Sequence, residues 1–390
     1  MRKITYIGVA CLVAATLGAW LWVDAQRYSS ERIIAECDEV GNTALCYTDR
    51  LTEVLDQRGI PAAFDVLADI YNADQNFAGT CHAETHEIGK TAYALFQKTG
   101  HIDLSPNAHY CGYGFYHGFM EALFADTNDL QEARDFCSFV GRSVSHPPPP
   151  EFAEGSCYHG IGHGVTDGTD PRVWGDPIAL VKPGLALCAK VTQGNESWHR
   201  RCASGVFNAL GNMYPDPKYK LDAGTNPYTL CNDESFNPIE KEMCYNQMNT
   251  QAAALAGNDL RTIVAFSNPI RDVRYRSSAL HEAVSFYIQV LKRKHTTLPP
   301  EDVAVCLLPI FSLRESCVSG FVGGIFEFGS PGQQYKEVLQ LCGAEKFPED
   351  LSGLCYESLL KHAGFYNDKR TIERICEAVP LQYHTSICTL

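Results

Sequence analysis

The sequence contains no long run of Lys and Arg, and 32 basic residues stand against 46 Asp and Glu among 390, a formal net charge of −14. A protein that binds nucleic acid neutralises backbone phosphates with clustered cations. We therefore expect no nucleic-acid partner. The acidic balance otherwise indicates little beyond solubility.

Several catalytic and cofactor motifs are also missing. The chain has no Gly-x-Ser-x-Gly nucleophile elbow, no Walker loop and no Gly-x-Gly-x-x-Gly after a strand. It has no Cys-x-x-Cys-His, so nothing indicates covalently attached haem. Alternating runs of Val, Ile and Thr, which are typical of strands, are scarce. With 45% hydrophobic and 11% aromatic residues the chain can still bury a large core, and we expect an all-α fold.

The N-terminus forms a distinct segment. A basic pair precedes Ile4–Val23, twenty residues without a charge. At ~1.5 Å per residue this stretch matches the ~30 Å hydrocarbon core of a bilayer, whereas a cleavable signal has about 7–15 apolar residues. We expect a transmembrane signal-anchor over 1–25, although Val23-Asp24-Ala25 also fits a weak signal cleavage site. In both cases the basic pair directs 26–390 to the extracytoplasmic side, and an uncleaved anchor would also hold this domain at the membrane.

Cysteine usage agrees with export. Of the 17 cysteines, Cys11 lies inside the apolar segment, and the other 16 are an even number. In an exported chain this count predicts up to eight disulfides, whereas in a cytosolic enzyme it would indicate metal binding or catalysis. We expect the domain to face the periplasm, the extracellular space or a secretory lumen.

The cysteines also reveal an internal repeat. Six pairs recur with separations of 11–20 residues; an apolar, helix-like run ends at the first cysteine, and a second helix begins at the next. These pairs are Cys137 with Cys157, Cys188 with Cys202, Cys231 with Cys244, Cys306 with Cys317, Cys342 with Cys355, and Cys376 with Cys388. By elimination, Cys37 pairs with Cys46 and Cys81 with Cys111.

Each repeat is interpreted as helix A, a loop and helix B, with a disulfide joining the end of A to the start of B. A hairpin of ~35–45 residues cannot bury its apolar stripe alone, so neighbours should stack as an α-solenoid or superhelical array. A glycine recurs three places into helix B, as at Gly114, Gly205 and Gly320, which suggests that neighbouring B helices approach closely. The alternative is a non-repetitive helical protein with irregular cysteine pairing.

Histidines gather at the start of three successive B helices, within 81–167. They are His82, His86, His117, His159 and His163. His82 and His86 have i, i+4 spacing, and so do His159 and His163. This spacing places both imidazoles of a pair on one face of a helix, as in the zinc motif His-Glu-x-x-His. Neutral imidazole suits a divalent transition metal such as zinc, copper or iron, and the disulfides leave no thiolate to compete. The sequence therefore predicts one mononuclear or one dinuclear metal site.

Carboxylates continue the same helix faces, since Glu121 follows His117 by four residues and Asp167 follows His163 by four. Together with Glu87 they are candidate proton acceptors in a metal-dependent enzyme, whose metal would support hydrolysis or oxygen and redox chemistry. One alternative is a helical-repeat scaffold that binds a peptide or protein partner and has structural histidines. Another is metal capture without turnover. Two further histidines, at positions 281 and 362, are interpreted as isolated polar residues.

Overall fold

The computed structural model describes residues 27–143, 150–166, 168–294, 296–330, 332–367 and 369–389, which form helices, turns and loops without a strand. The all-α prediction is confirmed for this part of the chain. The predicted signal-anchor over 1–25 lies outside the described residues, and so does Asp167. None of the helices that the structure describes is both long enough and apolar enough to cross a bilayer.

The α-helices follow one another with short connections. In chain order they are α2 (Ser30–Asp38), α3 (Thr43–Ala73), α4 (Gln75–Thr80), α5 (His82–Thr99), α6 (Gly114–Asp126), α7 (Leu130–Ser143), α8 (Pro150–Gly164), α9 (Pro177–Thr192), α10 (Glu196–Met213), α11 (Pro238–Gln247), α12 (Asn249–Leu255), α13 (Leu260–Phe266), α14 (Val273–Arg293), α15 (Arg314–Phe328), α16 (Gln334–Cys342), α17 (Ser352–Tyr366) and α18 (Lys369–Ala378).

Local sequence determines where several helices begin. The side chain of Asp176 accepts hydrogen bonds from two backbone N–H groups of α9, and Pro177 occupies the first turn, where its missing N–H is not needed. At α11, Asn237 and Glu240 form a reciprocal capping box. Each such cap satisfies donors that the helix leaves open and typically contributes about 1 kcal/mol.

Eight disulfides join the cysteines of the described residues, and every predicted pairing is present, including the two assigned by elimination. Such a disulfide density is typical of an oxidising, extracytoplasmic environment. The expected helix A is not always an α-helix. Cys231 and Cys306 lie in the 3-10 helices η4 (Pro227–Asn232) and η5 (Pro300–Leu307), because each segment is a short run that begins with proline and closes through i→i+3 bonds.

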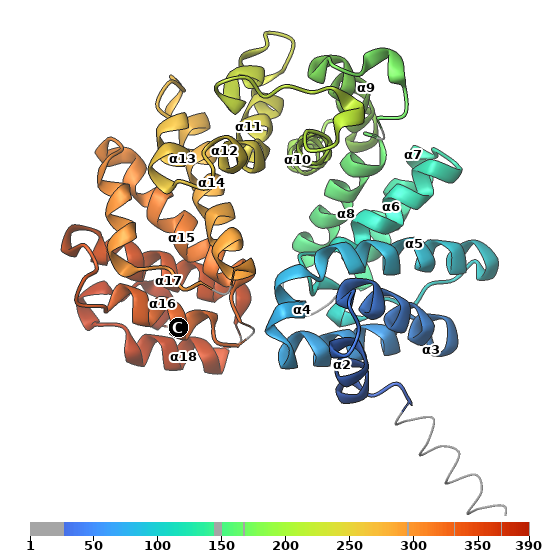
Figure 1. Cartoon of the computed structure of the whole chain (residues 1–390), viewed down its shortest axis with the longest axis horizontal. Coiled ribbons are helices and arrows are strands. Elements are labelled where there is room, and N and C mark those ends of the chain that lie inside the picture. The colour runs from blue at the N-terminus through green and yellow to red at the C-terminus, as the bar shows by residue number, and fades with distance from the viewer. Residues whose placement is uncertain are drawn as a thin grey trace, which may run out of the picture.

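The helices that follow the cysteines pack against one another in chain order. Contacts run from α5 to α6, then to α8, α10, α11, α14, α15 and α17. Figure 1 shows that this row curves, and α4 contacts α14, so that the N-terminal and C-terminal halves meet. The two halves have their own hydrophobic cores, one from residues between Tyr28 and Ala279 and one from residues between Leu260 and Val379.

Glycine lets these helices approach closely. A Cβ atom on Gly118 of α6 would lie 1.9 Å from the carbonyl oxygen of His86 in α5. A Cβ atom on Gly205 of α10 would lie 1.9 Å from the carbonyl oxygen of His159 in α8. No side chain fits in either space, so both contacts require glycine. Side chains on neighbouring helices can therefore reach one another.

Candidate metal centre

All five histidines predicted as metal ligands lie together. Helix α5 carries His82 and His86, α6 carries His117, and α8 carries His159 and His163. The centroids of neighbouring rings lie 4.8–5.9 Å apart. Two groups of three have potential ligand atoms within 4.8 Å of one another: the first triad is His82, His86 and His117, and the second triad is His117, His159 and His163. His117 belongs to both triads.

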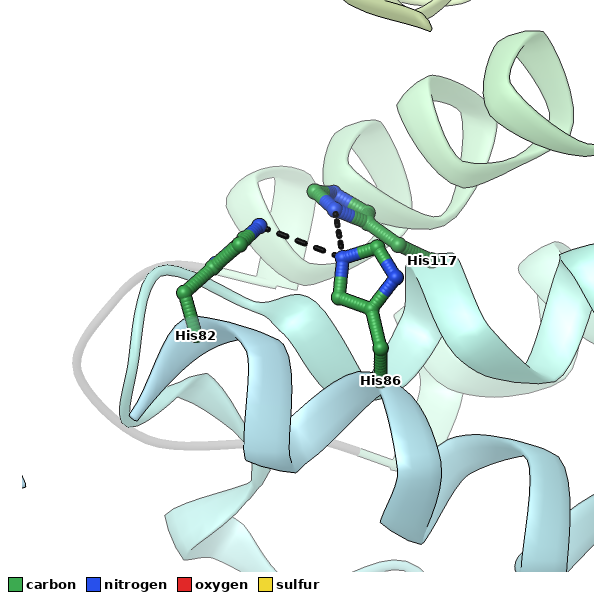
Figure 2. A group of neighbouring side chains, drawn as sticks. All are labelled: His82, His86 and His117. Atoms are coloured by element: carbon green, nitrogen blue, oxygen red, sulfur yellow. Dashed lines mark hydrogen bonds between the residues drawn. The ribbon is translucent and has the colours of Figure 1, made fainter. Parts of the chain in front are cut away.

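Two of the three nitrogen–nitrogen separations in the first triad match those of ligands that share one ion. Nε2 of His82 lies 3.2 Å from Nε2 of His86, and Nδ1 of His117 lies 3.3 Å from the same His86 nitrogen. Figure 2 shows the three rings directed at one another from α5 and α6. Nitrogens bound at ~2.0–2.1 Å to a tetrahedral ion lie about 3.3–3.4 Å apart. Both measured separations are therefore close to the edge of such a tetrahedron.

The outer nitrogens of two of these rings already have partners. Nδ1 of His82 donates to the backbone carbonyl of Cys111 at 2.8 Å, and Nδ1 of His86 donates to the Glu121 carboxylate at 3.1 Å. A neutral ring that donates from Nδ1 has a lone pair on Nε2. If both rings are neutral, two Nε2 lone pairs face each other at 3.2 Å, which is repulsive unless a metal ion or a proton lies between them. Orientation of a ring through its outer nitrogen is typical of metal-binding histidines.

A proton on His82 or on His117 is a poor candidate for that cation. Burial among protein atoms and then the neighbouring His86 lower the pKa of His82 to about 4, although its side chain keeps contact with water. Burial, followed by His159 and His163, lowers the pKa of His117 far below its usual range. Both rings are therefore neutral at pH 7. His117 can donate from Nδ1 to His86, and the lone pair of His82 then has a donor only if Nε2 of His86 carries a proton as well. A metal ion would satisfy all three nitrogens.

The second triad is more deeply buried. Nδ1 of His159 lies 3.1 Å from the Ser204 hydroxyl, and Nδ1 of His163 lies 3.7 Å from Glu121. Nε2 of His163 is buried and makes no hydrogen bond of normal geometry among the residues that the structure describes, although the Asn208 side chain lies close enough to the ring to raise its pKa. A polar atom left in this state costs about 1–3 kcal/mol. Burial and then His86 lower the pKa of His163 to about 3, so the ring is neutral.

The three candidate proton acceptors have different positions. Oε1 of Glu121 lies against His86 and 3.7 Å from Nδ1 of His163, on the outer side of both rings. Burial raises the pKa of Glu121, but the hydrogen bond from His86 and nearby positive charge outweigh it, so the net pKa is lowered and the group is ionised. Glu121 is therefore placed to orient ligands. Glu87 is exposed and pairs with Lys90 at 2.8 Å. A catalytic role for these two residues, or for Asp167, stays a prediction.

The helix pair α14–α15 repeats the packing of α5–α6. In both pairs, glycines of the second helix lie against carbonyl oxygens of the first at the same spacing: Gly114 against His82, Gly118 against His86, Gly320 against His281, and Gly324 against Ser285. By this register Glu327 corresponds to Glu121, whereas Gly323 stands at the position of His117. The C-terminal half therefore keeps the packing without the triad.

Two histidines that the sequence suggests are isolated, His281 and His362, lie together in the structure. A Cβ atom on Gly323 would lie 3.1 Å from Cε1 of His362 and 3.6 Å from Cε1 of His281. The missing side chain makes room for both rings. Among the described residues around His281 and His362, no three His, Cys, Asp or Glu side chains lie close enough to share a metal ion. Helical spacing could not reveal the pair, because it depends on contacts between helices far apart in the chain.

No protein-family model, no curated protein and no solved structure matches this chain. Function is therefore argued from the site, because one fold hosts many unrelated chemistries. The two triads offer imidazole nitrogens, with oxygen atoms beside the outer nitrogens of four of the five rings. At His82 the first triad is open to water.

Proposed function

We propose that this chain is an extracytoplasmic zinc-dependent hydrolase whose ion is held by His82, His86 and His117. The observation that carries the proposal is the pair of Nε2 atoms that face each other at 3.2 Å while both Nδ1 atoms bind oxygen. Three imidazoles leave the fourth position of a tetrahedral ion open, which is the arrangement of catalytic rather than structural zinc. The exposure of His82 supports access for water and substrate.

Zinc fits the donors better than iron or copper(II). Mononuclear iron oxygenases combine two histidines with a carboxylate ligand, whereas Glu121 here lies on the outer nitrogen of His86. Copper(II) prefers tetragonal geometry, in which neighbouring nitrogens at ~2.0 Å bond length would lie about 2.8 Å apart. The separations of 3.2 and 3.3 Å in the first triad are closer to the tetrahedral value.

Zinc would supply the nucleophile. A zinc-bound water has a pKa of about 7 instead of 15.7, so hydroxide is available at neutral pH to attack a carbonyl or phosphoryl centre. This chain would contribute the orientation of the ligands. The carbonyl that holds His82 belongs to Cys111, whose disulfide to Cys81 ties the start of α5 to the segment before α6. We further propose that residues 1–25 tether the enzyme to the membrane, with the site facing the oxidising compartment.

A partner-binding scaffold is the second candidate function. Leu308, Ile310 and Phe311 are 60%, 57% and 81% exposed within four residues, which is an unusual concentration of large apolar side chains on a surface. Replacing all three with serine should abolish association with a partner while leaving the zinc content unchanged. An unaltered association profile on size-exclusion chromatography would count against this candidate.

Metal analysis of the full-length protein tests the proposed function. Protein purified from an oxidising compartment should contain at least about one equivalent of zinc, and the His82→Ala/His86→Ala variant should lose it from the first triad. The matched control is His281→Ala, which changes the residue at the corresponding position of α14. Hydrolysis of activated ester and phosphoester probes should stop with a chelator and return with zinc. A folded wild type without metal would overturn the proposal.

A further inference from the structure

His117 lies at the centre of the histidine cluster rather than at its edge. Its ring centroid lies 5.2 and 5.1 Å from those of His82 and His86, and 4.8 Å from both His159 and His163. Rings bound at ~2.0–2.1 Å to one tetrahedral ion have centroids about 5 Å apart. Both triads therefore have the dimensions of a three-histidine site, and they share one ring.

The shared ring has two nitrogens on different sides. Nδ1 of His117 faces His86 in the first triad at 3.3 Å. An imidazole that binds one ion through Nδ1 still has Nε2, and loss of the Nε2 proton makes it a ligand for another ion. His117 is 5% exposed, so its second nitrogen is removed from bulk water.

The other two rings of the second triad also have an oxygen atom near Nδ1, although these contacts are looser than those in the first triad. His159 and His163 have i, i+4 spacing on α8, and the Nδ1 atom of each lies beside an oxygen of Ser204 or Glu121. The buried Nε2 atom of His163 makes no hydrogen bond of normal geometry among the described residues. This unsatisfied atom is an independent observation that points to a missing ligand in the second triad.

From this geometry we infer that the centre is dinuclear, with a second transition-metal ion bound by His159, His163 and the deprotonated Nε2 of His117. Binding of the second ion releases the Nε2 proton of His117 to solvent, and the resulting imidazolate bridges the two ions. Oε1 of Glu121 binds His86 of the first triad and lies 3.7 Å from Nδ1 of His163 in the second, so its negative charge would lie near both ions. The first ion would be open to water at His82, and the second would lie among two buried rings and one half-buried ring. The inference rests on the proposed first site, because the two share His117.

Zinc stoichiometry distinguishes the two sites. Full-length protein stripped with a chelator and dialysed against zinc should bind about two equivalents. His159→Ala/His163→Ala and His82→Ala/His86→Ala should each retain about one, and His281→Ala/His362→Ala, a control in the C-terminal half, should retain about two. Each variant is first checked for native circular dichroism and for the absence of free thiols other than Cys11.

The outcomes separate this inference from the proposed function. About one equivalent in the wild type, unchanged in His159→Ala/His163→Ala, overturns the dinuclear centre and leaves the first site standing. No bound zinc overturns both. Two equivalents that survive removal of His159 and His163 place the second ion elsewhere and also overturn the inference. The wild-type stoichiometry can overturn the dinuclear centre without any variant, so the inference can still be tested if a variant fails to fold.

Copper(II) serves as a probe of the bridge. Protein loaded with one equivalent of copper should give an ordinary paramagnetic resonance signal, and full loading should reduce the signal per copper because an imidazolate couples the two spins antiferromagnetically. His117→Gln should abolish this coupling. Two copper ions per chain with full, independent signals would show that His117 does not bridge them.

Discussion

Gly118→Ala should weaken both the fold and the metal site by moving two helices apart. A Cβ atom at this position would lie 1.9 Å from the His86 carbonyl oxygen and 2.6 Å from the carbonyl carbon, and both are backbone atoms that cannot rotate away. Real Cβ contacts essentially never fall below 3.0 Å. Helices α5 and α6 must therefore separate by about 1 Å, and His82 and His86 must move away from His117.

The size of the effect follows from two opposing terms. Alanine is a better helix former than glycine by about 1 kcal/mol, while forcing a methyl group into a filled space costs about 1–3 kcal/mol or more. Because the clash is with backbone atoms, we expect the upper part of that range and a net loss of about 2 kcal/mol in the free energy of unfolding. Metal–ligand distances tolerate only about 0.2 Å, so a shift near 1 Å should reduce zinc affinity by at least the 10–100-fold typical of outer-shell changes.

Urea unfolding and zinc competition with a chromophoric chelator measure the two effects. The matched control is Gly79→Ala in α4, where an added Cβ atom meets nothing within 4 Å. The control should raise stability by up to about 1 kcal/mol and leave zinc affinity unchanged. If Gly118→Ala behaved like this control, close glycine contact would not be what assembles the first triad, and the reasoning would be refuted.

Three further predictions follow from the same geometry. Without metal, the protein should lose stability as the pH falls from 7 toward 5, because His163 has a pKa of about 3 when buried and near 6.5 when unfolded, so only the unfolded state takes up the proton. Each histidine with such a lowered pKa should reduce the free energy of unfolding by about 1.4 kcal/mol per pH unit below 6.5. A urea midpoint that does not change over this pH range would contradict the prediction. Glu121→Gln should lower zinc affinity about 10–100-fold in the same chelator assay with little change in circular dichroism, and unchanged affinity would show that the carboxylate does not orient His86. Replacing Cys81 and Cys111 with serine opens a loop of 30 residues, which should lower the free energy of unfolding by about 4 kcal/mol and also lower zinc affinity. Removing the Cys376–Cys388 disulfide should lower the free energy of unfolding by about 3 kcal/mol and leave zinc affinity unchanged. Calorimetry and metal titration measure the two effects.

Features that depend on neighbours in the chain could be predicted. Cysteine pairs such as Cys188 and Cys202 close short loops, so their partners follow from spacing and flanking pattern, and the structure confirms them. The i, i+4 spacing of His82 and His86 places both rings on one face of α5 whatever the tertiary fold, and their Nε2 atoms do lie 3.2 Å apart.

Features that depend on which helices meet could not be predicted. Nothing near His86 in the chain indicates that its Nδ1 atom binds Glu121. From the sequence, Glu121 fits the role of a proton acceptor equally well. The pairing of His281 with His362 requires α15 to lie between them with glycine at 323. Such contacts depend on the distance and register between helices. A glycine allows a close approach, but its position in the sequence does not say which helix will approach.

The cysteine framework of an exported protein, the helical repeats and the five histidines at one place in the repeat can be inferred from the chain alone, because covalent loops and helical periodicity are local properties. Only the tertiary structure decided that the five rings form two triads around His117, with four outer nitrogens beside oxygen atoms. A histidine side chain can rotate, so the direction of its nitrogen lone pair in the protein is fixed only when a hydrogen-bond partner on another segment holds the ring.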